Sequence, residues 1–84
     1  MLISVWTKSN CVACTQTKRL MDKFGIRYEE LNLEEHPDTL QAFIEAGHTS
    51  APIVVTDIKV WSGFRMDKIK SLASHLNGES ARLS

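Results

Sequence analysis

The chain has 84 residues with ten basic and ten acidic side chains, and its formal net charge at pH 7 is zero. This length fits one small domain, and the balanced charge gives no reason to expect binding to nucleic acid or to an anionic membrane. The sequence contains no run of about 18 apolar residues, so we expect no membrane-spanning helix. It begins at once with an apolar stretch, which leaves no room for a secretory signal, and we therefore expect a cytoplasmic protein.

The first half of the chain predicts a strand, a helix and a second strand. Residues 2–6 are almost entirely apolar, which is typical of a buried parallel strand. After a polar loop, apolar side chains recur at spacings of three and four from Ala13, which predicts an amphipathic helix that stops at Gly25. The imperfect alternation in residues 27–33 predicts a strand near a sheet edge. A β-α-β unit of this length pairs its two strands in parallel.

The second half predicts a helix, two strands and a last helix. Residues 34–47 begin with acidic residues and a proline and end with a glycine, which are typical start and stop signals of a helix. Residues 52–55 and 59–61 predict two strands joined by a short turn. Apolar side chains on one face then predict a final helix that stops at the Asn77-Gly78 pair.

This order, β-α-β-α-β-β-α, indicates the α/β class. Four strands need cover on both sides, so we expect a four-stranded mixed sheet with the first and third helices on one face and the second on the other. We assign this single domain to residues 1–78 and expect residues 79–84 to form a flexible tail.

The Cys11-Val12-Ala13-Cys14 motif lies between the first strand and the first helix. The free N–H groups and the positive dipole end of a helix N-terminus favour a thiolate over a thiol. Cys14 lies one turn further along, within reach to close a disulfide. A Cys-x-x-Cys motif beside a β-α-β unit therefore predicts dithiol–disulfide exchange, with Cys11 attacking and Cys14 resolving.

Three other interpretations of the cysteine pair stay open. A closed zinc site needs four ligands, whereas His36, His48 and His75 are scattered singly, so we expect no metal and treat these histidines as surface residues. The pair could also be two buried structural thiols. The third alternative is a non-catalytic thioredoxin-like module that docks a partner.

Two further motifs carry a family resemblance. Cys-x-x-Cys followed by Ala51-Pro52 before the third strand resembles the thioredoxin superfamily, and the element order resembles its glutaredoxin branch. The run Trp61-Ser62-Gly63-Phe64-Arg65 resembles the signature of the NrdH-redoxins, and the resemblance extends over residues 2–76.

The resemblance implies a thioredoxin fold and a redox carrier that reduces protein disulfides. Its implied partners are the large subunit of class Ib ribonucleotide reductase, as substrate, and thioredoxin reductase, as electron donor. The sequence has no Gly-rich dinucleotide loop, so we expect no bound cofactor and a supply of electrons from NADPH through that separate reductase. We expect the protein to be a monomer.

The resemblance also implies the substrate-binding residues. In the superfamily the peptide bond before this proline is cis, which places the backbone of Ala51 beside the sulfurs, where an extended partner segment can pair. Trp61 and Phe64 could instead be core or surface aromatics, and Lys8 a solvated loop residue. The full implied set is Lys8, Val12, Ala13, Ala51, Pro52, Trp61, Ser62, Gly63, Phe64 and Arg65.

The chain departs from the family pattern at two positions. Ala13 replaces the usual Gln before the second cysteine, and Met66 replaces the usual Pro before the last helix. Glutathione-binding glutaredoxins typically carry acidic residues near this helix start, where this chain has Arg65. We therefore predict poor use of glutathione, unless Asp67 takes the place of the missing acid. A glutathione-dependent glutaredoxin is the alternative function.

Overall fold

The computed structural model describes residues 2–83, with side chains for residues 2–76. Its elements are β1 (Ser4–Thr7), α1 (Val12–Lys23), β2 (Glu29–Asn32), the 3-10 helix η1 (Leu33–Glu35), α2 (Pro37–Glu45), β3 (Ile53–Val55), β4 (Val60–Ser62) and α3 (Met66–Leu83). The strand order is β2-β1-β3-β4, in which β1 pairs with β2 in parallel and the other two pairs are antiparallel. These findings confirm the predicted α/β class, the mixed sheet and the edge position of the second strand. Within residues 2–83, no helix is long and apolar enough to cross a membrane.

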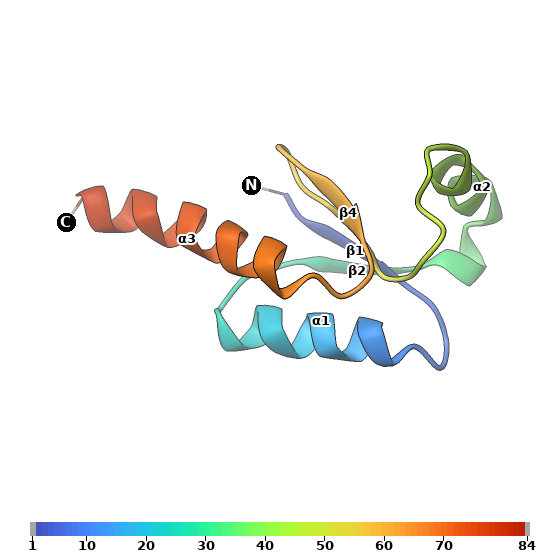
Figure 1. Ribbon diagram of the computed structural model, residues 1–84, viewed down its shortest axis with the longest axis horizontal. Helices are drawn as coiled ribbons and strands as arrows, with labels where there is room; N and C mark the ends of the chain where they lie inside the picture. Colours follow the sequence, from blue (N-terminus) through green and yellow to red (C-terminus); the bar gives the residue numbers. More distant parts are fainter. Residues whose placement is uncertain (1, 84) are drawn as a thin grey trace.

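The main core lies between one face of the sheet and the helices α1 and α3 (Figure 1). Val5, Val54 and Trp61 are cross-strand partners on neighbouring strands, and all three belong to this core. Met21 from α1 and Ile69 from α3 are fully buried against them. This packing follows from the helical spacing of apolar residues and the two-residue period of the strands.

Helix α2 covers part of the opposite face, where Trp6 points away from the main core. The rings of Trp6 and Phe43 meet edge to face at a centroid distance of 5.5 Å, and His36 contacts Trp6 in the same manner at 5.3 Å. The predicted three layers are confirmed, but α2 contains no buried residue. Its contacts with the sheet include the edge-to-face rings of Phe43 and Trp6.

The predicted second helix divides into two parts. The side chain of Asn32 accepts a hydrogen bond from the Glu34 N–H at 2.8 Å, which closes the separate turn η1. Helix α2 then begins at Pro37, which has no N–H to continue the preceding turn. The C-cap is Ala46 rather than Gly47, and Gly47 follows it at φ +94°, in the left-handed region that favours glycine.

The predicted end of the last helix is wrong. Helix α3 continues through Asn77 and Gly78 to Leu83. Glycine inside a helix costs about 1 kcal/mol relative to alanine, and the good helix formers among residues 79–83 offset a cost of that size. The side chains of residues 77–84 lie outside the described part, so a flexible tail stays a prediction.

Candidate functional site

Cys11 is the N-cap of α1. Its backbone is extended (φ −115°, ψ 103°), and its Sγ accepts a hydrogen bond from the Cys14 N–H at 3.1 Å. Asn10, just before it, adopts φ +55°, a left-handed conformation that asparagine tolerates better than most residues. The polar loop thus turns the chain so that a sulfur, in place of the usual oxygen, caps the helix.

The two sulfurs form a disulfide and differ in exposure. The Cα atoms of Cys11 and Cys14 are 5.2 Å apart. Cys14 is 3% exposed, Cys11 is half-buried, and Val12 between them is 72% exposed. In the reduced protein, a substrate disulfide can therefore approach the Cys11 sulfur, whereas Cys14 is shielded from solvent.

The Ala51–Pro52 peptide bond is cis, as predicted. The Ala51 carbonyl oxygen lies 3.7 Å from Cys11 Sγ, so the backbone before the proline borders the cysteine pair. The Pro52 carbonyl in turn accepts a hydrogen bond from the Gly63 N–H at 2.8 Å, and Gly63 has φ +81°. This bond connects the Trp61–Arg65 run to the proline beside the sulfurs.

The structure distributes that run between the core and the surface. Trp61 is only 4% exposed and belongs to the main core, and its contact with a substrate stays a prediction. Trp61 alternates along β4 with Val60 and Ser62, and this two-residue period turns it inward. Phe64 is half-buried against the core and Arg65 is exposed. Substrate contacts by Phe64 and Arg65 stay predictions.

Arg65 and Asp67 form an ion pair with two hydrogen bonds at the start of α3. Arg65 Nε donates to Asp67 Oδ1 at 3.1 Å, and Arg65 Nη2 donates to Oδ2 at 3.0 Å. These hydrogen bonds, together with the charge of Arg65, hold the pKa of the Asp67 carboxyl below its usual range. Asp67 is therefore already occupied by a cation of its own chain. Met66, between them, is 45% exposed and is the first residue of α3.

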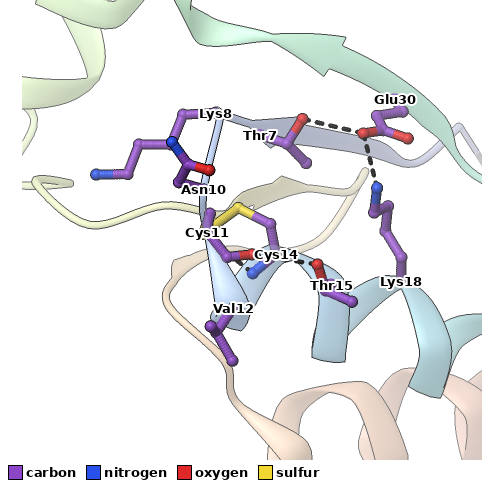
Figure 2. Close-up of a pocket in the computed structure, with 9 residues that line it drawn as sticks. All are labelled: Thr7, Lys8, Asn10, Cys11, Val12, Cys14, Thr15, Lys18 and Glu30. Atoms are coloured by element: carbon purple, nitrogen blue, oxygen red, sulfur yellow. Dashed lines mark hydrogen bonds and ion pairs between the residues drawn. A yellow bond between two sulfur atoms is a disulfide. The ribbon is translucent and has the colours of Figure 1, made fainter.

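A cavity of about 430 Å³ lies beside the disulfide (Figure 2). Lys8, Val12 and both cysteines were expected there. The sequence interpretation missed the other residues of the lining, which are Thr7, Asn10, Thr15, Lys18 and Glu30. Glu30 lies on β2, beside Val5 of β1 in the parallel register. Only that register, which the sequence does not specify, places this carboxylate on the wall of the same cavity as the cysteines.

Metal binding was one of the three open alternatives for the cysteine pair. Among the residues that the structure describes, no group of three or more His, Cys, Asp or Glu side chains lies close enough together to hold a metal ion. His36 and His48 instead contact the aromatic rings near α2, and His75 is exposed on α3.

Residues 3–61 match the glutaredoxin family. The chain is 32% identical over 72 residues to the glutaredoxin-like protein NrdH of Lactococcus lactis subsp. lactis, a match that covers 86% of this chain and 100% of that protein. It is 38% identical to NrdH of Salmonella typhimurium, over 86% of this chain and 89% of that one. The solved structure of Escherichia coli NrdH-redoxin, a glutaredoxin-like protein described as having a thioredoxin-like activity profile, matches with a TM-score of 0.82 at 36% identity. That structural match covers 86% of this chain and 95% of the other.

Proposed function

This chain belongs to the glutaredoxin family, as an NrdH-like thiol–disulfide oxidoreductase, and we propose that it supplies electrons to class Ib ribonucleotide reductase. In this proposal, the large subunit of that enzyme is the disulfide substrate, and thioredoxin reductase restores the dithiol. The protein holds no cofactor of its own, and its electrons originate from NADPH bound to the reductase.

The environment of Cys11 is the observation that carries the mechanism. A half-buried sulfur at the N-terminus of α1, with a backbone N–H directed at it, is placed to act as a thiolate nucleophile. It attacks one sulfur of the substrate disulfide, forms a mixed disulfide, and displaces the other substrate sulfur as a thiolate that takes up a proton.

Cys14 completes the transfer from its buried position. Its thiol loses a proton and attacks Cys11 Sγ, which forms the Cys11–Cys14 disulfide and breaks the mixed disulfide. The second substrate sulfur leaves as a thiolate and is protonated. The substrate gains two electrons and two protons, and the cysteine pair loses the same number.

Two observations support the proposed partners over glutathione. The relatives named above are NrdH proteins, and the one of known structure has a thioredoxin-like activity profile. In addition, Arg65 presents a cation near the start of α3 and occupies the Asp67 carboxylate. The family resemblance implies that glutathione-binding glutaredoxins use an acidic side chain near this helix start to hold the ammonium group of glutathione.

The deciding experiment compares two reducing systems on the oxidised protein. We expect rapid reduction by thioredoxin reductase with NADPH and slow reduction by glutathione with glutathione reductase. Efficient turnover with glutathione alone would identify an ordinary glutaredoxin instead. Insulin disulfide reduction provides the control for redox activity itself, because a non-catalytic docking module would fail in it.

A further inference from the structure

A pair of opposite charges lies on the wall of the cavity beside the disulfide. Glu30 Oε2 accepts a hydrogen bond from Thr7 Oγ1 at 3.1 Å and forms an ion pair with Lys18 Nζ at 3.0 Å. Figure 2 shows Thr7 and Lys18 converging on this carboxylate from β1 and α1. Of the described residues that line the cavity, Glu30 alone carries a negative charge, whereas Lys8 and Lys18 are positive.

The surroundings of this pair are partly shielded from solvent. Thr7 is 7% exposed, and the side chains of Lys18 and Glu30 are 32% and 44% exposed. Charges in such a position are screened less than fully exposed ones, so they act on nearby ionisable groups. The nearby groups that change charge during the reaction are the two cysteine sulfurs, which line the same cavity.

The two charges have opposite effects on the redox equilibrium. The disulfide is neutral, whereas the reduced pair carries negative charge when Cys11 is a thiolate. The Lys18 cation alone would stabilise the reduced form and so make the pair a weaker reductant. The Glu30 anion neutralises that cation and opposes the thiolate, which shifts the equilibrium back towards the disulfide.

We propose that Glu30 is a positioning residue that neutralises Lys18 beside the cysteines and thereby keeps the Cys11–Cys14 pair strongly reducing. This inference rests on the thiol–disulfide chemistry above, but it does not depend on which protein is the partner. In this proposal, two charged side chains outside the Cys-x-x-Cys motif influence the redox equilibrium of the cysteine pair.

The test measures an equilibrium with the small reductant dithiothreitol. The oxidised protein accepts two electrons and two protons, while dithiothreitol is oxidised from its dithiol to its cyclic disulfide. Alkylation of free thiols followed by mass spectrometry gives the fraction of reduced protein across a series of dithiothreitol ratios. No protein partner takes part, so this result is independent of the assay with thioredoxin reductase.

Glu30→Gln is expected to shift the equilibrium constant towards the reduced form by about three- to tenfold, which corresponds to about 15–30 mV. The thiolate absorbance of the reduced variant should also develop at lower pH. Lys18→Gln should shift both readouts in the opposite direction, and the double variant should return close to the wild type.

Glu29→Gln is the matched control, because Glu29 is an exposed neighbour on the same strand and does not line the cavity. Circular dichroism of every variant checks that the fold is intact. Equal potentials for Glu30→Gln and Glu29→Gln would overturn the proposal. A shift of the same sign in Glu30→Gln and Lys18→Gln would overturn it too, because a purely structural disturbance gives that pattern.

Discussion

The ion pair between Arg65 and Asp67 suggests a physical basis for the predicted poor use of glutathione. The guanidinium donates to both carboxylate oxygens of Asp67, so the ammonium group of glutathione finds this carboxylate occupied and a cation beside it. Arg65→Gln removes the competing cation and leaves the carboxylate free. We therefore expect this variant to use glutathione better than the wild type.

The expected gain is limited by the exposure of the pair. The side chains of Arg65 and Asp67 are 48% and 66% exposed, so solvent screens the pair and its contribution is small. For that reason, kcat/KM for glutathione should rise by at most about fivefold. The assay couples glutathione to glutathione reductase and NADPH at low ionic strength, and added salt should reduce the difference.

Two outcomes would refute this explanation. Equal glutathione rates for Arg65→Gln and the wild type would show that the pair does not discriminate. A gain that survives in the double variant with Asp67→Asn would show that the freed carboxylate is not the cause. The pH dependence provides a further check. Because Arg65 lowers the pKa of Asp67, the pair persists above that lowered pKa and is lost as pH falls through it, so the Asp67 carboxyl should titrate at a higher pH in Arg65→Gln than in the wild type.

Three further predictions concern the cysteines, the core and the loop. Cys14→Ser should trap a mixed disulfide with a protein substrate on non-reducing gels and Cys11→Ser should trap none; an adduct only in the latter would reverse their roles. In urea unfolding, Met21→Ala, which empties a fully buried site, should cost about 2–5 kcal/mol, whereas Met66→Ala at the surface should change stability by less than about 0.5 kcal/mol. The backbone N–H and the hydroxyl of Ser9 both donate to the Glu34 carboxylate and lower its pKa. These hydrogen bonds are therefore present above that pKa and are lost as pH falls through it. Protection of the loop amides, taken relative to the intrinsic exchange rate at each pH, should decrease over that range, and in Glu34→Gln it should already be lower at neutral pH; unchanged protection in the variant would contradict this.

The sequence specifies most of the fold because its periodic patterns report which side of each element is buried. Met21 on α1 and Ile69 on α3 occur at helical spacing, and both are fully buried as that pattern predicts. The pattern is less informative at α2, which contacts Trp6 yet buries none of its own residues. The end of α3 was mispredicted because Asn77-Gly78 is a local signal, and the residues after it favour the helix.

The cysteine site likewise has some features that depend on the nearby sequence and others that depend on contacts between distant segments. The N-cap position of Cys11 could be predicted, because a polar loop before a helix fixes it within a few residues of sequence. The proposed role of Glu30 could not be predicted from the sequence. Glu29 and Glu30 are adjacent acidic residues in one short strand, and only one of the two side chains can point towards the cavity beside the cysteines. The parallel register beside Val5 and the reach of Lys18 from α1 make that choice, and both depend on contacts between distant segments. Residues that tune a redox site from a neighbouring strand therefore become visible only when the sheet is assembled. For this reason, the comparison of Glu30→Gln with Glu29→Gln tests the assembled site rather than the motif.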